Sequence, residues 1–498
     1  MSALNDLFSI LSQEEQAQFV RYLNTRNRRS DVRNVELFEA MLNEKEDRLK
    51  SKIGSNAYNV LRNRLKHRMI DFIAQSTMQK EGSTENELSK IFITAKRLLK
   101  REKTESAFKL LLKLEKDARY FENYTLEGEI QQLLIEYAHI SGAPNLEELN
   151  QRSTKNYQLQ RAHTNLNLAY ARIRMAYQAV EYQGEHVDLA KLLNTTFAEF
   201  AISDEIAYGF SSLHQLVQLT DIYGAYSNSY HEINLFFIDK LRDLQGGKSD
   251  NEQNLHYHIE ILYVIAHIYF RKKDFETSSR FLAQMKEQMD RFSGKSPAQH
   301  ELKWRMLSAL NSNHIGNAIE ARSHIDFILD QKISLDETIQ IRLTLAMLQI
   351  QQGELRECQR TLSRFAHTDT WYEKNLGIEW TLHKLTIEIL LHIDLENYDY
   401  AESRLKSLLR KYKNYLNKEG KDQARPFLRL VQTILRDPST VGSDKFHEQV
   451  ESSIHWKKIE EEDVFRINFY AWLKAKMNGA EVYPTLLNLL DKTELTNV

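Results

Sequence analysis

Apolar residues recur at intervals of three and four along most of the chain, which is the spacing of one face of an α-helix. No stretch alternates apolar and polar residues in the manner of a β-strand. The spacing predicts three helices before residue 80 and three more between residues 88 and 140. Further helices are predicted at 158–180, 210–225, 231–244, 255–271, 275–291, 301–313, 317–330, 335–352, 354–366, 376–394 and 398–417. The predicted fold class is all-α.

A shorter pattern recurs within these helices: a tight turn, a small residue, and apolar residues four and seven positions later. In one copy the turn at 316–317 precedes Ala321, which is followed by Ile325 and Ile328. The small side chain lets the second helix of a hairpin approach the first closely. The small residues are Ala107, Ser278, Ala321, Cys358 and Ala401, the last four separated by 43, 37 and 43 residues. The pattern therefore predicts stacked antiparallel helical hairpins, an α-solenoid.

Four stretches that carry this pattern resemble degenerate tetratricopeptide repeats. In the first, Ala266 and Tyr269 precede the turn at 273–275, and Ser278 follows it, in the order of the family. In the next two copies Ser312 and Gln349 replace the aromatic residue. The stretches are 261–285, 306–329, 343–365 and 385–408. The resemblance implies a right-handed superhelix, although a regular repeat has ~34 residues and these spacings are longer.

The first 82 residues contain no copy of the pattern, which favours a division of the chain into three parts. We expect an N-terminal basic helical module over 1–82, degenerate repeats over 83–436 and C-terminal capping helices over 437–498. With this organisation the chain is also similar to uncharacterised bacterial proteins that join a short helical module to a degenerate repeat array.

Composition and charge limit the binding partners and the cellular compartment that can be expected. The formal net charge of −2 provides no global attraction to nucleic acid or anionic lipid. The single cysteine excludes an internal disulfide, and we interpret Cys358 as a small buried residue. The first ten residues lack the features of a secretion signal, and the most apolar stretch, 255–270, is too short and too polar to span a membrane. We expect a cytoplasmic protein without a membrane partner.

The strongest local charge asymmetry lies near the N-terminus. Residues 21–68 carry 13 basic side chains against six acidic ones. On the third predicted helix the basic residues form two rows with a spacing of four, Arg62 with Lys66 and Arg64 with Arg68. This face is a candidate nucleic-acid-binding surface. A face that is solvated or paired with acidic residues explains the charges equally well, and no recognition motif accompanies them.

A second candidate surface is the helix predicted over 158–180. Asn165, Asn167, Arg172 and Arg174 are residue types that grip an extended peptide inside a helical superhelix. They are the candidate peptide-binding residues.

Signs of catalysis, metal binding or cofactor binding are weak. Two Gly-Lys-Ser triplets, at 247–249 and 294–296, lack the earlier glycine of a phosphate-binding loop. The pairs Glu379/His383 and Glu388/His392 fall on opposite sides of one predicted helix. His256 and His258 diverge on another. We therefore predict no catalytic residue, no metal site and no cofactor.

Together these observations favour a non-enzymatic helical-repeat scaffold that binds a protein or peptide on its concave surface. One alternative is a regulator or defence factor whose basic N-terminal helices contact nucleic acid. The other, less favoured, is an enzyme with a site assembled between helices.

Overall fold

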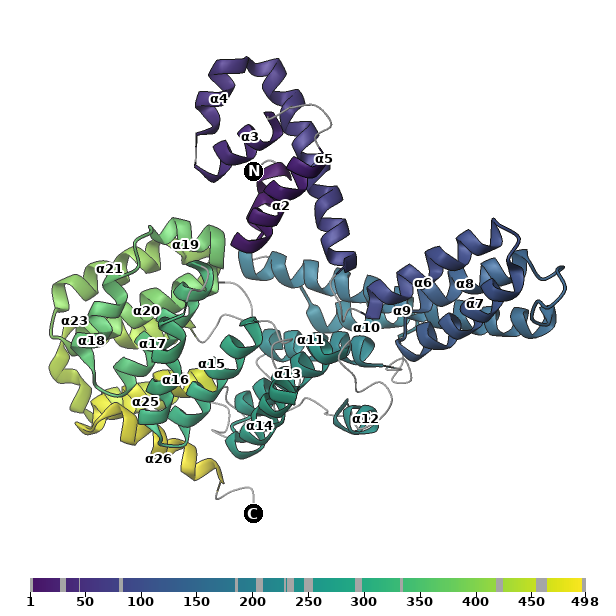
Figure 1. Ribbon diagram of the computed structural model, residues 1–498. Coiled ribbons are helices and arrows are strands. Elements are labelled where there is room, and N and C mark those ends of the chain that lie inside the picture. Colours follow the sequence, from purple (N-terminus) through teal and green to yellow (C-terminus); the bar gives the residue numbers. More distant parts are fainter. Residues whose placement is uncertain are drawn as a thin grey trace. The chain divides into compact units, whose positions relative to one another are not determined.

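The computed structural model confirms the all-α fold (Figure 1). Every regular element in the described part of the chain is a helix. Both Gly-Lys-Ser triplets and residue 82 lie outside that part. The structure describes residues 3–26, 33–43, 45–79, 84–183, 187–202, 209–227, 230, 237–245, 254–291, 298–331, 335–417, 424–453 and 464–494.

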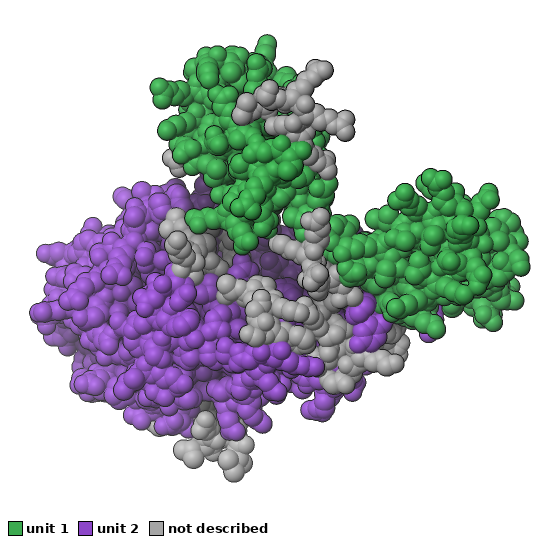
Figure 2. All heavy atoms as spheres, in the orientation of Figure 1, with its two compact units in different colours: residues 1–119, 123–153 green, residues 120–122, 154–498 purple. Residues whose placement is uncertain are grey.

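The chain divides into two compact units (Figure 2). The first comprises Met1–Arg119 and Asn123–Ser153, and the second comprises Tyr120–Glu122 and Thr154–Val498. The first unit thus extends beyond the segment expected to form an N-terminal module. Its helices are α1 (Ala3–Ser9), α2 (Gln13–Arg26), α3 (Arg33–Leu42), α4 (Glu46–Ile53), α5 (Ser55–Gln79), α6 (Thr84–Leu99), α7 (Thr104–Tyr120) and α8 (Tyr124–Glu136), with the start of α9 (Leu146–Gln183).

The long helix α5 organises the first five helices, because α1, α2, α3 and α4 all contact it. Leu65 and Met69 of α5 are fully buried, together with Phe19 of α2 and Phe38 of α3. The rings of Phe19 and Phe38 pack edge to face with centroids 5.0 Å apart. Apolar residues at a spacing of three and four thus give α5 one face that the shorter helices cover.

The second unit contains the remaining helices. They are α10 (Leu189–Glu199), α11 (Phe210–Ser227), α12 (Phe237–Leu244), α13 (Leu255–Arg271), α14 (Phe275–Arg291), α15 (Ala298–His314), α16 (Ala318–Leu329), α17 (Leu335–Gln351), α18 (Leu355–Ser363), α19 (Asp369–Leu376), α20 (Ile378–Asp394), α21 (Tyr398–Lys411), α22 (Lys413–Leu416), α23 (Ala424–Arg436), the 3-10 helix η4 (Pro438–Gly442), α24 (Asp444–Ser453), α25 (Val464–Asn478) and α26 (Val482–Glu494).

Four successive helix pairs in this unit form at the predicted repeats: α13 with α14, α15 with α16, α17 with α18 and α20 with α21. The small residue of each second helix is fully buried. In two pairs it also bonds to the first helix, since Ser278 Oγ donates to the carbonyl of Ala266 at 2.7 Å and Cys358 Sγ donates to that of Ala346 at 3.3 Å. Close approach of the two helices therefore has the predicted cause.

The turn of each pair requires a backbone conformation that side chains disfavour. Gly316 and Gly353 have φ of 93° and 76°, where glycine carries no steric cost. Lys273 and Glu396 occupy the same region, with φ of 66° and 59°. The turn residues thus end each first helix in a left-handed position.

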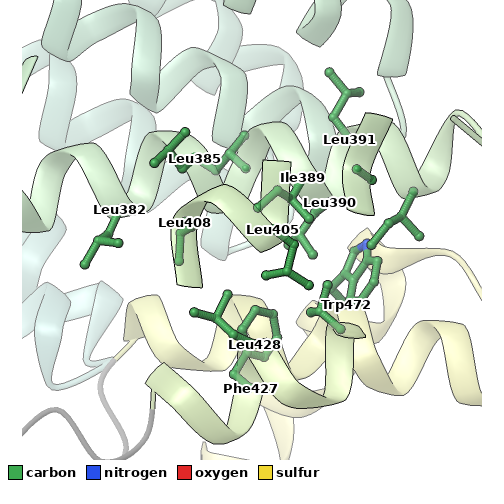
Figure 3. Packing of buried hydrophobic residues seen from close by; sticks show 14 of the residues in the cluster. Leu382, Leu385, Ile389, Leu390, Leu391, Leu405, Leu408, Phe427, Leu428 and Trp472 are labelled. Atoms are coloured by element: carbon green, nitrogen blue, oxygen red, sulfur yellow. The ribbon is translucent and has the colours of Figure 1, made fainter. Parts of the chain in front are cut away.

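The last helices of the chain pack on these pairs. Around α20 the core includes leucines of α20 and α21, Phe427 of α23 and Trp472 of α25 (Figure 3). Trp472 Nε1 donates to the carboxylate of Asp394, and Lys476 Nζ lies 2.7 Å from it. Tyr483 of α26 donates to the carbonyl of Asn313 at the end of α15 at 2.7 Å. Helices α25 and α26 therefore belong to the core of the second unit.

Candidate functional site

Polar residues follow one face of α13, a helix that is otherwise buried and apolar. The intervals of four, three, four and four residues place them on one face of a helix. Ile261, Leu262 and Ile265 occupy the remaining faces and are fully buried. The polar residues are His256, Glu260, Tyr263, His267 and Arg271. We call this set the α13 polar stripe.

The first end of the stripe holds a histidine–carboxylate cluster. His256 Nδ1 lies 3.0 Å from Nε2 of His300, which α15 contributes. The same His300 nitrogen lies 3.4 Å from Oε1 of Glu260. One ligand atom from each of the three residues falls within 4.8 Å of the other two. His256 is exposed, whereas Glu260 and His300 are buried.

A lysine forms an ion pair with Glu260. Lys303, one turn along α15 from His300, lies with Nζ 2.7 Å from both carboxylate oxygens. Burial alone would raise the pKa of Glu260, but hydrogen bonds from His300 and Lys303 outweigh it and hold that pKa at about 2. The carboxylate is therefore ionised at neutral pH and is available as a ligand.

Burial favours the neutral form of the neighbouring imidazoles. His214 of α11 lies with its ring centroid 6.2 Å from that of His256. Burial lowers the pKa of His214 to about 4, and burial also lowers the pKa of His256. Neutral imidazoles can act as metal ligands or as partners in neutral hydrogen bonds.

The second end of the stripe is an aspartate–histidine pair. Asp221 Oδ1 of α11 lies 2.9 Å from Nδ1 of His267 and accepts from the hydroxyl of Tyr230 at 3.0 Å. Burial would raise the pKa of Asp221, but the charge of His267 and its hydrogen bond lower it. Tyr263 stacks on His267, and burial raises the pKa of its hydroxyl. This end is an internally bonded network that ties α11 to α13.

The predicted nucleic-acid-binding residues of α5 differ in their surroundings. Arg62 is engaged within its unit, since its guanidinium lies 2.6 Å from Glu46 and donates to Asn5 at 2.7 Å. Arg64 is exposed, and Lys66 is half-buried. Arg68 lies 4.0 Å from Asp71. Of the four, Arg64 presents its charge most openly.

The predicted peptide-binding residues of α9 fall on two faces. Asn165 and Arg172 are seven residues apart and both contact the end of α10: Asn165 donates to the carbonyl of Phe200 at 3.0 Å, and Arg172 pairs with Glu199 at 2.6 Å. Asn167 is two residues, or ~200°, from Asn165 and contacts Gln215 of α11 at 2.5 Å. Arg174 shares the side of Asn167. The four residues therefore do not form one row.

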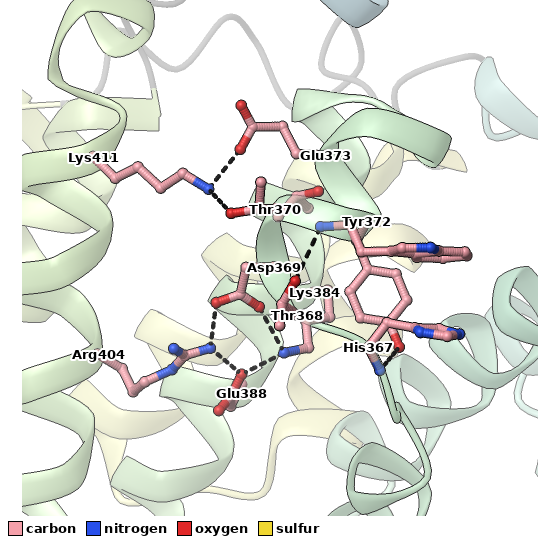
Figure 4. Close-up of polar contacts among 12 residues, drawn as sticks. His367, Thr368, Asp369, Thr370, Tyr372, Glu373, Lys384, Glu388, Arg404 and Lys411 are labelled. Carbon is pink, nitrogen blue, oxygen red and sulfur yellow. Dashed lines mark hydrogen bonds and ion pairs between the residues drawn. The ribbon is translucent and has the colours of Figure 1, made fainter.

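The two glutamate–histidine pairs of α20 have separate surroundings. Glu388 lies 2.9 Å from both Lys384 and Arg404 (Figure 4). It also accepts from the hydroxyl of Tyr400 at 2.7 Å. His383 is exposed, on another side of the helix. Among the described residues, the only group with metal-ligand geometry is His256, Glu260 and His300.

The sequence alone did not predict this group, although two of its three members have a recognisable spacing. His256 and Glu260 have the spacing of four that places two ligands on one helical face. The third member, His300, is 40 residues from Glu260 and joins the group only because α15 packs beside α13.

Comparisons with known proteins add no relative: a scan of protein-family models and searches of curated proteins and of solved structures found no match. Within the described residues, no helix combines the length and apolar character needed to cross a membrane.

Proposed function

We propose that the protein is a non-enzymatic, tetratricopeptide-like scaffold. In this proposal the helical hairpins form a right-handed superhelix whose concave surface, lined by first helices, binds a protein or peptide partner. Support comes from the order of contacts: α11 packs on α13, α13 on α15, and α17 on α20, while each second helix covers its own first helix. Repetition of one unit with large helical surfaces suits binding better than catalysis.

The C-terminal helices provide further support, because they use first-helix surface in the manner proposed for a partner. Asn468 of α25 donates to the sulfur of Met347 in α17 at 3.8 Å, and Phe469 packs with its ring centroid 6.5 Å from that of His383 in α20. A helix that is buried over most of its surface thus packs along two neighbouring first helices. Recognition of a helix in a groove is a common way to bind a protein partner.

The observation that carries the proposal is an exposed apolar row on α9. Tyr157, Leu168 and Met175 are 66%, 49% and 70% exposed. Their spacings of 11 and seven residues place them within ~20° of one another around the helix. Arg172, beside this row, has its guanidinium 5.0 Å above the ring of Phe200. Large exposed apolar residues aligned on one helical face are typical of a protein-binding surface.

The test is affinity capture from native lysate with the full-length chain and with the variant L168E/M175E. The wild type should recover a stoichiometric partner, and the variant should lose it because two charges enter an apolar contact. The control is I319E, since Ile319 is 86% exposed on the second helix α16. This control should retain the partner. Recovery of the same proteins by wild type and L168E/M175E would overturn the proposal.

The nucleic-acid alternative has less support, because Arg62 is committed to Glu46 and Asn5. Arg64 and Lys66 would have to provide most of the phosphate contact on α5. An enzymatic role has no described arrangement of nucleophile, base and orienting group behind it.

A further inference from the structure

The cluster of His256, Glu260 and His300 has the dimensions of a metal site. With bonds of ~2.0–2.1 Å, two ligands of a tetrahedral zinc ion lie about 3.3–3.4 Å apart. His256 Nδ1 and His300 Nε2 are 3.0 Å apart, and His300 Nε2 and Glu260 Oε1 are 3.4 Å apart. The edge between His300 and Glu260 therefore matches, and the edge between His256 and His300 is about 0.3 Å shorter than the separation in a tetrahedral site.

The donor chemistry selects the ion. Two imidazole nitrogens and one carboxylate oxygen suit zinc and its first-row neighbours, whereas calcium and magnesium prefer oxygen alone. The hydrogen bond between the facing nitrogens of His256 and His300 places a proton between them. On metal binding this proton moves to the other nitrogen of its own ring, so both facing nitrogens can offer a lone pair without loss of a proton.

We propose that His256, Glu260 and His300 bind one zinc ion, which links the first helices α13 and α15 of successive hairpins. Three protein ligands leave one tetrahedral position for water. Because His256 is exposed, the ion can enter from solvent. Zinc binding can be tested separately from partner binding, since its ligands lie on α13 and α15 and the exposed apolar row lies on α9.

Lys303 is the built-in competitor of the ion. Its Nζ lies 2.7 Å from both oxygens of Glu260, including the oxygen that would ligate zinc. When the ion takes Oε1, Lys303 must retain Oε2 alone, and the two positive charges repel. Replacement of Lys303 by methionine keeps a side chain of similar length and removes this charge.

The experiment is zinc titration by calorimetry with the untagged, metal-free, full-length chain. The wild type should bind one zinc ion per chain. His256 is exposed, so H256A should fold normally. It should lose at least about 100-fold in affinity, the upper end of what loss of an outer-sphere partner costs. The control H383A removes an exposed histidine of α20 and should bind as the wild type does. K303M should bind zinc more tightly than the wild type, because the positive charge beside the ion is removed.

A second variant and a second measurement guard against indirect effects. E260Q should also lose zinc binding, and cobalt(II) in the wild type should show the intense visible absorption of a tetrahedral site, absent in H256A. Equal zinc affinity in wild type and H256A would overturn the proposal. Cobalt absorption unchanged by H256A would overturn it as well. Weaker binding by K303M would contradict the role of Lys303 as a competitor of the ion.

Discussion

Glu260 and Glu388 are two buried carboxylates on first helices of the same unit, and their surroundings differ. Glu388 of α20 lies 2.9 Å from both Lys384 and Arg404, and these two cations also hold Asp369 at 3.2 and 3.1 Å (Figure 4). Two acids thus face two bases. Glu260 of α13 faces one lysine and two imidazoles.

The difference lies in what each carboxylate can exchange. The charged partners of Glu388 are a lysine and an arginine, which have no lone pair to offer an ion. Two partners of Glu260 are imidazoles, which can shift a proton and offer a lone pair, so they can become ligands. Both carboxylates are buried on related helices, but their partners differ. These partners therefore predict a structural ion network around Glu388 and a site that can bind a metal ion around Glu260.

The largest effect should come from breaking the Glu388 network. R404M leaves two carboxylates with one lysine, and a buried charge without its partner is costly. We expect a loss of about 3 kcal/mol in the free energy of unfolding, at the lower end of that range because Arg404 is partly exposed. Urea denaturation followed by circular dichroism measures it.

The matched control is R410M on the same helix. Arg410 is exposed, so its replacement should change stability by no more than ~0.5 kcal/mol. If R404M and R410M lost the same free energy of unfolding, the ion network around Glu388 would stabilise the protein no more than an exposed arginine does.

The second prediction separates the two glutamates by their response to zinc. Zinc at 100 times its dissociation constant should stabilise the wild type by about 2.7 kcal/mol, seen as a higher midpoint of thermal unfolding. E260Q should abolish this shift because it removes a ligand. E388Q should retain the shift even if its starting midpoint is lower. A zinc response lost in both variants would remove the distinction between the two sites.

The helices of the hairpins were predictable to within a few residues. The spacing of apolar residues predicted 255–271 and 275–291, and the structure has Leu255–Arg271 and Phe275–Arg291. Ser278 and Ala321 are fully buried between the helices of their pairs. Residues at such an interface recur at a regular spacing that can be recognised in the sequence. By contrast, α9 begins at Leu146, well before the predicted start at 158. The prediction began too late because the first turns of this helix carry few apolar residues.

The candidate site was not predictable in the same way. Glu388 and Arg404 meet only because α20 and α21 form a hairpin, and His300 reaches Glu260 only because two hairpins stack. Such contacts depend on side-chain direction between helices, which no local spacing records. The peptide-binding prediction had the same weakness, since Asn165 and Asn167 lie near each other in sequence but on different faces of α9.

The smallest effect concerns acid sensitivity near Glu260. A histidine whose pKa is lower in the folded than in the unfolded state contributes stability above its unfolded value, and this stability is lost as the pH falls towards the folded value. For His214 the window runs from about 6.5 down to about 4. Between pH 7 and pH 5 the wild type should lose about 1 kcal/mol from this residue, after allowance for its partial exposure. H214Q should lose correspondingly less in urea denaturation at the two pH values. H383Q, which changes an exposed histidine of α20 on another side of the helix from Glu388, should lose as much as the wild type. If H214Q and H383Q fall equally with pH, the acid sensitivity does not arise at the α11–α13 face, and the contrast between the two sites rests on their cations alone.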